Sequence, residues 1–362
     1  MKAVVLVGGE GTRLRPLTLD TPKQMLPVVD TTMIERVLGH LGDHGVDEAV
    51  LSLGYRPEAF LAAFPDGLAC GIKLRYAVDP EPLDTAGAIR FAAQEIAVSE
   101  TFIVVNGDVL TDADFSALLA RHRQLGAEAT IHLTPVSDPS AFGVVPTDDG
   151  GRVLAFIEKP KAGEAPTNLI NAGAYVLEPA VLDLIPPGRR VSAERETFPA
   201  LVARGGLFGW PSEDYWIDAG TPDAYLRACL DLVGGARPGS PVPGAWRASP
   251  DVWAVGVPDI GGQVRGPALV ADGSYVAPGA ELYGSVLGAG AQVAPGAKVA
   301  GSVLLAGARV CVGARVEGSI IGPCASVGQG ATVGALSVLG RGAMVAPGAQ
   351  VIGGRISRMV DQ

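Results

Sequence analysis

The feature that most constrains the fold is a six-residue period in the last part of the chain. Gly-Ala or Pro-Gly-Ala stands between most of the recurring apolar residues. A hexapeptide repeat of this kind is typical of a parallel β-helix, in which one apolar side chain per rung points into a narrow prism and small residues form the corners. We expect about five coils over residues 263–362. The steps are six, with occasional fives, at Val264, Val270, Val276, Leu282, Leu287, Val293, Val299, Leu304, Val310, Val316, Ile321, Val327, Val333, Leu339, Val345, Val351 and Ile356.

Residues 1–232 follow another pattern, in which apolar runs alternate with helical spacing. Such alternation predicts a doubly wound, mostly parallel α/β sheet of Rossmann-like type. Ligands bind beyond the carboxyl ends of the strands in these sheets, where Gly8 and Asn106-Gly107-Asp108 stand. The Gly/Pro-rich residues 233–262 are expected to link the two domains. Strands are expected at 3–7, 49–53, 72–76 and 102–105, and helices at 32–40, 57–64 and 86–97.

Charge and composition exclude several classes of protein. A net charge of −10 argues against nucleic-acid binding. The apolar run after Met1-Lys2 is too short for a signal peptide, and no run approaches a membrane span, so we expect a cytoplasmic protein without a membrane partner. The four cysteines lack C-x-x-C spacing, which favours buried free thiols over zinc or disulfides.

A glycine-rich loop, Gly8-Gly9-Glu10-Gly11-Thr12-Arg13-Leu14-Arg15-Pro16, follows the first expected strand. Its glycines let backbone N–H groups approach an anion. Arg13 can grip phosphate in a bidentate fork, and Lys23 adds a point charge. Leu14 stands where a dinucleotide fingerprint needs its third glycine, and the P-loop motif is absent. The remaining alternative is a flexible turn with solvated arginines.

The loop and the following PKQMLPV (22–28) resemble the nucleotide-sugar pyrophosphorylases, or sugar-1-phosphate nucleotidyltransferases. Within that family the chain looks most similar to mannose-1-phosphate guanylyltransferases. The resemblance covers nearly the whole chain and implies that the tail is a left-handed β-helix. Other segments that carry it are EPLDTAGAI (81–89), VVNGDVL (104–110), FGVV (142–145), FIEKP (156–160), NLINAGAYV (168–176), ERETFPAL (194–201) and YWIDAGTP (215–222).

The resemblance implies an enzyme that transfers a nucleoside monophosphate from an NTP to a sugar 1-phosphate and releases pyrophosphate. A lone aspartate at a strand end is more often a turn or cap residue, but the family implies Mg²⁺ at matching aspartates, and Mg²⁺ prefers such oxygen ligands. The implied roles are catalysis for Arg13, Lys23 and Asp108; nucleotide binding for Gly8, Gly9, Gly11, Thr12, Arg13, Lys23, Thr85 and Gly107; sugar-phosphate binding for Gly143, Glu158, Lys159 and Asn171; and Mg²⁺ binding for Asp108 and Asp218.

The base and the acceptor are less constrained. Asp84 stands where the family usually has glycine, and Lys23-Gln24 looks more like thymidylyltransferases than the Lys-Pro of guanylyltransferases. The tail segments favour guanine, so GTP and mannose 1-phosphate are expected. A cyclitol 1-phosphate acceptor stays open, as does thymidylyl, uridylyl or adenylyl transfer to glucose 1-phosphate.

Two other classes of function stay open. A β-helix acyltransferase would typically use a histidine base, but all four histidines precede the tail. A non-catalytic subunit that binds nucleotide sugars would be expected to lack loop or metal residues, which are all present here. The tail is expected to mediate homo-oligomerisation, because a β-helix has a regular surface and open ends.

Overall fold

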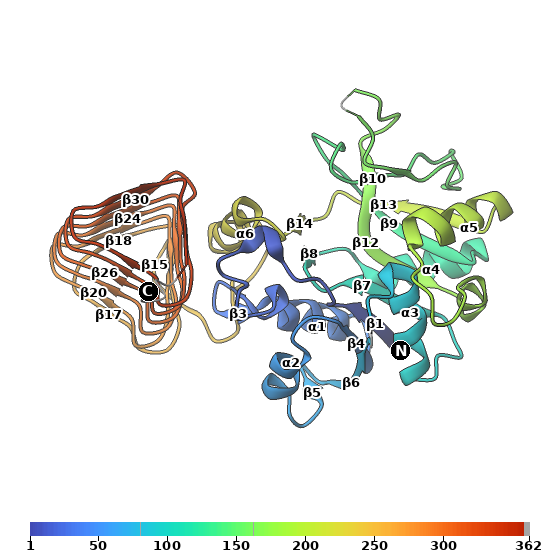
Figure 1. Cartoon of the computed structure of the whole chain (residues 1–362), viewed down its shortest axis with the longest axis horizontal. Helices are drawn as coiled ribbons and strands as arrows, with labels where there is room; N and C mark the ends of the chain where they lie inside the picture. The colour runs from blue at the N-terminus through green and yellow to red at the C-terminus, as the bar shows by residue number, and fades with distance from the viewer. Residues whose placement is uncertain (80, 162, 358–362) are drawn as a thin grey trace. The chain divides into compact units, whose positions relative to one another are not determined.

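The computed structural model describes residues 1–79, 81–161 and 163–357. The chain forms two compact units, each built from separated segments. The sheet unit consists of Met1–Gly9 and Ile34–Trp216, and the helix-prism unit consists of Glu10–Met33 and Ile217–Gln362. The predicted fold class, a Rossmann-like α/β domain followed by a left-handed parallel β-helix, is confirmed (Figure 1). The segment Glu10–Met33, called the loop segment below, therefore groups with the β-helix.

The sheet unit centres on parallel strands in the order β7-β1-β4-β6, close to the predicted positions. The antiparallel β12 extends the sheet beyond β7. The ten strands are β1 (Lys2–Leu6), β4 (Glu48–Leu53), β5 (Leu68–Ala69), β6 (Ile72–Val78), β7 (Phe102–Asn106), β9 (Ala129–Pro135), β10 (Gly143–Val144), β11 (Ile157–Glu158), β12 (Leu169–Leu177) and β13 (Leu207–Pro211). The short β2 (Pro27–Val28) and β3 (Thr31–Thr32) pair within the loop segment.

Amphipathic helices join these strands. In α1 (Met33–Asp43), Ile34, Leu38 and Leu41 recur at helical spacing and are fully buried. An aspartate cap starts α4, where Asp114 accepts a hydrogen bond from the Ala117 N–H. The other helical elements are α2 (Pro57–Ala63), α3 (Asp84–Glu95), α4 (Phe115–Leu125), η3 (Pro179–Leu184), the π-helical turn η4 (Ala193–Thr197) and α5 (Phe198–Arg204).

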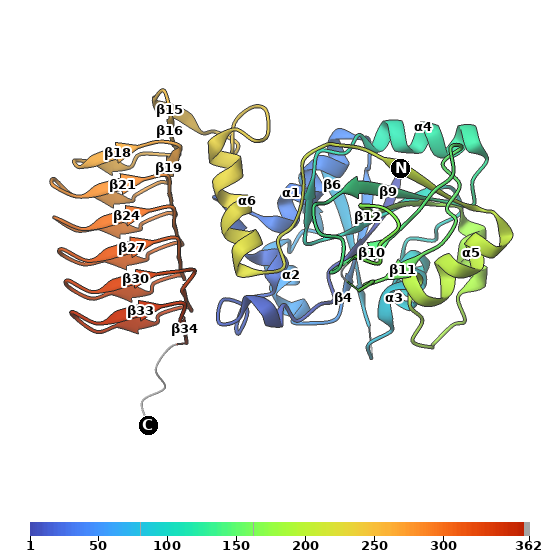
Figure 2. The same cartoon turned by 90° about the horizontal axis from the view of Figure 1, so that it is seen from above.

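The β-helix has three faces of parallel strands stacked coil on coil (Figure 2). Its predicted interior is confirmed, since Val270, Leu287, Leu304, Ile321 and Leu339 align in register and lie in one core. The first face holds β15 (Trp246–Ser249), β16 (Val252–Ala254), β19 (Ala268–Val270), β22 (Val286–Leu287), β25 (Val303–Leu304), β28 (Ile320–Ile321), β31 (Val338–Leu339) and β34 (Arg355–Ile356). The second holds β17 (Asp259–Ile260), β20 (Tyr275–Val276), β23 (Gln292–Val293), β26 (Arg309–Val310), β29 (Ser326–Val327) and β32 (Met344–Val345). The third holds β18 (Gln263–Arg265), β21 (Glu281–Tyr283), β24 (Lys298–Ala300), β27 (Arg315–Glu317), β30 (Thr332–Gly334) and β33 (Gln350–Ile352).

The second and third faces have six strands each, one coil more than expected. The additional coil begins inside residues 233–262, where Val252 of β16 joins the prism core and β17 starts the second face. This coil lacks the Gly-Ala corners of the later coils, and β15 returns antiparallel to β16. The hexapeptide pattern is therefore not recognisable in the sequence of this first coil.

One flank of the β-helix is apolar on its outside as well. Because side chains alternate along a strand, the residue before each inward one points outward. On the five middle strands of the first face, β19, β22, β25, β28 and β31, these outward residues are fully buried: Leu269, Val286, Val303, Ile320 and Val338. We call them the apolar flank. α6 (Pro222–Gly234) packs against β19 and β22 of this face. On the other two faces many outward residues are polar.

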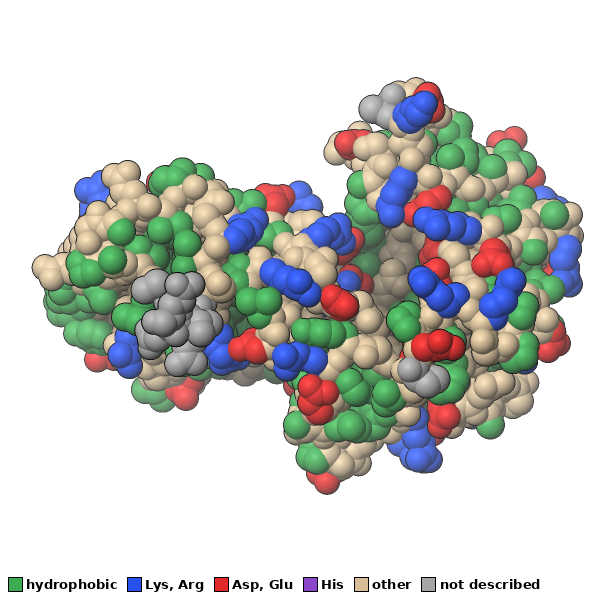
Figure 3. All heavy atoms as spheres, viewed as in Figure 1, with side chains coloured by type: hydrophobic (Ala, Val, Ile, Leu, Met, Phe, Trp, Pro, Cys, Tyr) green, Lys and Arg blue, Asp and Glu red, His purple; other side chains and the backbone are tan. Residues whose placement is uncertain are grey.

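The expectation of four buried thiols is wrong for Cys70 and Cys324, which are exposed, and only Cys229 is fully buried. Both exposed cysteines have positive φ and stand in turns between strands. All four are free, as predicted. On the face drawn in Figure 3, basic and acidic side chains are interspersed. Among the described residues, no helix is both long and apolar enough to cross a bilayer.

Candidate functional site

The carboxyl edge of the central sheet is lined with bare backbone. Gly107, after β7, donates its N–H to the Leu6 carbonyl at 2.9 Å. A Cβ at Gly107 would lie 2.5 Å from Val7 Cγ1, so no larger residue fits without a shift. A Cβ at Gly54, after β4, would lie 3.1 Å from the carbonyl oxygen of Gly8, after β1. Glycine at Gly107 and Gly54 is therefore required by the close packing of the strand ends against one another.

Asp108 follows Gly107 at this edge, between β7 and β8 (Val109–Thr111). It is partly buried. The glycine thus delivers a carboxylate to the strand end where ligands bind in sheets of this type.

In the helix-prism unit, Gly11 folds the loop segment onto Lys23. Gly11 has φ of 63°, in the left-handed region. A Cβ there would lie 3.0 Å from Lys23 Cβ and 3.1 Å from Thr18 Cγ2. Thr18 Oγ1 also donates to the Gly11 carbonyl at 2.7 Å. Glycine is therefore needed at position 11, where the phosphate-binding loop packs against Lys23, twelve positions later in the sequence.

The same unit brings together Arg13 and Asp218. Thr12 and the exposed Arg13 lie in a 3₁₀ turn, η1 (Thr12–Leu14), and Lys23 begins another, η2 (Lys23–Met25). Arg13 Nη2 lies 3.8 Å from Asp218 Oδ2 of β14 (Trp216–Asp218). Asp218 Oδ1 accepts the Gly220 N–H at 2.9 Å. An ion pair this exposed contributes little stability, so the guanidinium stays available to an anionic ligand.

Three of the four predicted sugar-phosphate residues, Gly143, Glu158 and Lys159, lie at β10 and β11. Gly143 pairs in register with Glu158, and a Cβ at Gly143 would lie 2.6 Å from Phe156 Cε1 and 3.1 Å from Glu158 Oε2. Lys159 has an exposed side chain, and its Nζ lies 3.2 Å from Glu158 Oε1. The structure therefore places the Lys159 ammonium beside the Glu158 carboxylate, and Glu158 beside Gly143.

Asn171 has partners inside its own strand. At the irregularity in β12, its Nδ2 donates to Tyr175 Oη at 2.8 Å and its Oδ1 accepts the Gly173 N–H at 3.0 Å. Gly173 has φ of 77°, and a Cβ there would lie 2.6 Å from Asn106 Nδ2. A sugar hydroxyl is thus not needed to satisfy this amide, and its sugar contact stays a prediction.

Glu194 is a functional candidate that sequence reasoning missed. Its Oε2 accepts hydrogen bonds from Thr85 Oγ1 at 2.7 Å and from Ser192 Oγ at 2.8 Å. Thr85 Oγ1 in turn accepts the Ala193 N–H at 2.8 Å. The predicted nucleotide ligand Thr85 is thus tied to η4 through its hydroxyl. The ERETFPAL motif contained Glu194, but nothing in the sequence paired it with a residue 109 positions earlier.

The backbone conformation of Asp84 explains the glycine that is usual at this position in the family. Asp84 begins α3 with φ of 60°, and left-handed backbone is the reason for glycine at such positions. Asp84 Oδ1 accepts the Thr85 N–H at 2.9 Å. Gln24, the other departure, is buried, and its Oε1 has no hydrogen-bond partner within the described part of the chain.

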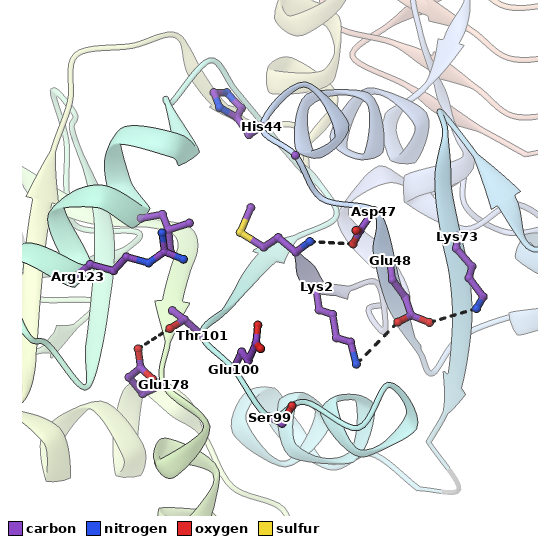
Figure 4. Close-up of a pocket in the computed structure, with 13 residues that line it drawn as sticks. Lys2, His44, Asp47, Glu48, Lys73, Ser99, Glu100, Thr101, Arg123 and Glu178 are labelled. Atoms are coloured by element: carbon purple, nitrogen blue, oxygen red, sulfur yellow. Dashed lines mark hydrogen bonds and ion pairs between the residues drawn. The ribbon is translucent and has the colours of Figure 1, made fainter.

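A hollow of about 1150 Å³ lies at the opposite edge of the sheet, where β1 and β4 begin (Figure 4). Its charges mostly satisfy one another: the Met1 amino group is 2.8 Å from Asp47, and Lys2 and Lys73 both approach Glu48. Thr101 donates to Glu178 at 2.6 Å. The hollow is therefore not the predicted site, which lies at the carboxyl ends of the strands.

No cluster of three or more His, Cys, Asp or Glu side chains suited to a metal occurs among residues 1–79, 81–161 and 163–357. One or two carboxylates together with substrate phosphates are the usual way in which Mg²⁺ is held. Asp108 and Asp218 supply hard oxygen ligands of that kind. Each aspartate is therefore the right type of ligand for a divalent ion that arrives with a phosphorylated substrate, and a site shared by the two stays a prediction.

Proteins of known function resemble this chain over most of its length. The chain is 44% identical over 287 residues to the mannose-1-phosphate guanylyltransferase of Mycobacterium tuberculosis, covering 79% of this chain and 74% of that one. It is 41% identical over 230 residues to the mannose-1-phosphate guanylyltransferase catalytic subunit beta of Dictyostelium discoideum, covering 62% and 63%. The solved structure of HddC from Yersinia pseudotuberculosis matches with a TM-score of 0.56 and 29% identity over 64% of this chain and 99% of HddC. HddC is also known in complex with GMP-PN.

Two family matches divide the chain. Residues 2–233 match the family described as nucleotidyl transferase, and residues 264–359 match the GMPPB C-terminal domain. The chain therefore belongs to the nucleotidyl transferase family of enzymes and carries the β-helical C-terminal domain found with it.

Proposed function

We propose that this chain transfers GMP from GTP to mannose 1-phosphate, forming GDP-mannose and releasing pyrophosphate. The observation that carries the proposal is the fold of the loop segment, in which Gly11 lies against Lys23 while Arg13 lies beside Asp218. Both cations precede a tail that matches the GMPPB C-terminal domain. The guanylyltransferase names of the relatives and the GMP-PN complex of HddC support guanine as the base.

Phosphate alignment accounts for the chemistry. The acceptor phosphate has a second pKa near 6, by analogy with other phosphomonoesters, and is ionised at neutral pH without a general base. Arg13 and Lys23 would hold the triphosphate, and Lys159 the acceptor phosphate, so that like charges can approach in line. Asp108 and Asp218 would hold Mg²⁺, which lowers that repulsion and stabilises charge on the leaving pyrophosphate. Gly8 and Gly9 would offer backbone N–H groups to the nucleotide. The Gly107 N–H is already bonded to the Leu6 carbonyl, so the predicted nucleotide contact of Gly107 would be made by another of its backbone atoms.

The test of the substrates is a matrix of NTPs against sugar and cyclitol 1-phosphates, read by pyrophosphate release. GTP with mannose 1-phosphate is expected to give the highest kcat/KM, and EDTA is expected to abolish release until Mg²⁺ is restored. A higher kcat/KM for dTTP with glucose 1-phosphate, or for a cyclitol phosphate, would replace these substrates. No release from any pair would refute the enzyme assignment.

The test of the residues is substitution. Arg13→Ala and Asp108→Asn are each expected to lower kcat by roughly 100-fold or more, since each removes charge stabilisation of the transition state. Melting temperatures should stay near that of the wild type, because the Arg13 side chain is largely exposed. Arg15→Ala is the matched control, because Arg15 pairs with Glu10 at 3.2 Å in the same loop. Near-normal kcat in the first two variants would contradict the assignment.

A further inference from the structure

The last coils of the β-helix contact the loop segment at a glycine. A Cβ added to Gly340 would lie 3.0 Å from Pro16 Cβ, 3.2 Å from Pro16 Cγ and 3.4 Å from Pro16 O, which are its three nearest atoms. Gly340 has no left-handed φ that would call for glycine. The coil itself accepts a large residue here, since Leu305 occupies the equivalent position two coils earlier and is buried. Gly288 and Gly322 also occupy this position, but there an added Cβ would meet the backbone of the next coil. At Gly340 the three nearest atoms all belong to Pro16, so glycine here permits the contact with Pro16.

An ion pair stands beside this contact. Arg341 Nε donates to Asp20 Oδ2 at 2.9 Å, and both side chains are about half exposed. Such a pair adds little stability by itself. Placed next to the Gly340–Pro16 contact, however, it fixes the orientation of the loop segment on the coil.

Two successive hydrogen-bonded turns connect the residues around Pro16 to Gly11 of the phosphate-binding loop. The Leu17 N–H donates to the Leu14 carbonyl at 3.0 Å, and the Leu14 N–H donates to the Gly11 carbonyl at 2.9 Å. Leu14 and Leu17 are buried. A displacement at Pro16 would therefore be transmitted to Gly11, and from there to Arg13 and Lys23.

We propose that the β-helix is a positioning element for the phosphate-binding loop, with Gly340 and Arg341 as positioning residues for Arg13 and Lys23. This inference rests on the proposed function of those two cations. It gives the tail a task within its own chain, in addition to the predicted self-association. Neither Gly340 nor Arg341 is assigned a contact with substrate.

The test is Gly340→Val in the full-length protein. A valine should push against Pro16 and raise the KM for GTP roughly ten-fold, because displacements of about 1 Å are costly at reacting groups. The KM for mannose 1-phosphate should change less than two-fold. Without nucleotide, the amides of Leu14 and Leu17 should exchange hydrogen faster. The matched control is Gly334→Val on the third face, where the nearest atom to an added Cβ is Ile352 Cδ1 at 3.6 Å.

Unchanged KM for GTP and unchanged amide exchange in a folded Gly340→Val protein would overturn the proposal, as would equal changes in Gly334→Val. If Gly340→Val does not fold, charge reversal decides: Arg341→Glu should raise the KM for GTP, and the double variant with Asp20→Arg should restore it. Failure to restore it would overturn the proposal. Amide exchange is measured without substrate, so it tests the contact between the β-helix and the loop segment independently of the proposed function. Faster exchange in Gly340→Val together with full activity of Arg13→Ala would support the contact but refute the proposed role of Arg13.

Discussion

At the scale of single residues, Asp84 shows how a side chain can occupy a position suited to glycine. Its carboxylate accepts the Thr85 N–H, and this bond offsets part of the cost of left-handed backbone. Asp84 therefore takes the left-handed conformation that glycine favours and adds a carboxylate to this segment. A contact between that charge and the substrate stays a prediction.

Replacing Asp84 with alanine keeps the left-handed strain and loses the hydrogen bond. Asp84→Ala is therefore expected to lower the free energy of unfolding by about 1 kcal/mol. Asp84→Gly loses the bond but also relieves the strain, so it should stay near the wild-type value. Urea denaturation measures both. An Asp84→Ala protein as stable as Asp84→Gly would contradict this account.

His132 makes a second prediction at this scale. It is buried in β9, its Nε2 lies 2.8 Å from Ser212 Oγ, and burial lowers its pKa to about 4. In the unfolded chain it titrates near 6.5. Between these two values only the unfolded state binds the proton, so the free energy of unfolding should fall as the pH drops from 6.5 to 4. The contribution of this one group is about 3 kcal/mol at most.

His132→Gln removes that titration and keeps a hydrogen-bonding side chain. Unfolding free energies measured at intervals from pH 7 to pH 4 should depend less on pH in the variant than in the wild type. Parallel pH curves for the two proteins would show that His132 is protonated equally well in the folded state.

At the scale of elements, the start of α3 is held against the segment that leads into η4. The N–H groups of Ala86 and Gly87 donate to the Val191 carbonyl, and the Val191 N–H donates to the Leu83 carbonyl. Thr85 and Glu194 add the side-chain link. Two segments about 105 residues apart thus form one hydrogen-bonded wall around Thr85, a predicted nucleotide ligand.

Thr85→Val keeps the shape of this wall but removes the hydroxyl. The Ala193 N–H then loses its acceptor and Glu194 loses a donor, so the free energy of unfolding should fall by about 1–3 kcal/mol. Denaturant unfolding measures the change. Thr332→Val, on an outer face of the β-helix, is the control and should be nearly neutral. Equal stability of the two variants would mean that the link contributes nothing.

At the scale of the whole molecule, the outer surface of the β-helix forms an apolar interface with α6. The apolar flank and α6 are buried together, and Tyr225 of α6 donates its hydroxyl to the Pro27 carbonyl of the loop segment. α6 therefore packs on the β-helix and is hydrogen-bonded to the segment that carries Arg13 and Lys23. The self-association predicted for the tail stays a prediction, and sedimentation at micromolar concentration would test it.

Ending the chain at residue 236 removes the β-helix and uncovers the apolar side of α6. The truncated protein is expected to aggregate or to melt at a lower temperature than the full chain, because exposed apolar surface is costly in water. Light scattering and thermal unfolding measure this. A monodisperse truncated protein with full-length kcat/KM would contradict the account.

By itself, the sequence determined the α/β sheet and the β-helix, and its resemblance to a known family implied the reaction class. The two folds follow from local periodicity, which depends on residues near each other in the chain. Only the tertiary structure decided that Gly11 lies on Lys23, that Thr85 meets Glu194, and that Gly340 is bare because Pro16 lies against it. Each of these contacts joins residues that no periodicity relates. The first coil of the β-helix was not predicted from the sequence, because a segment that lacks the repeat can still be stabilised by stacking on a regular coil.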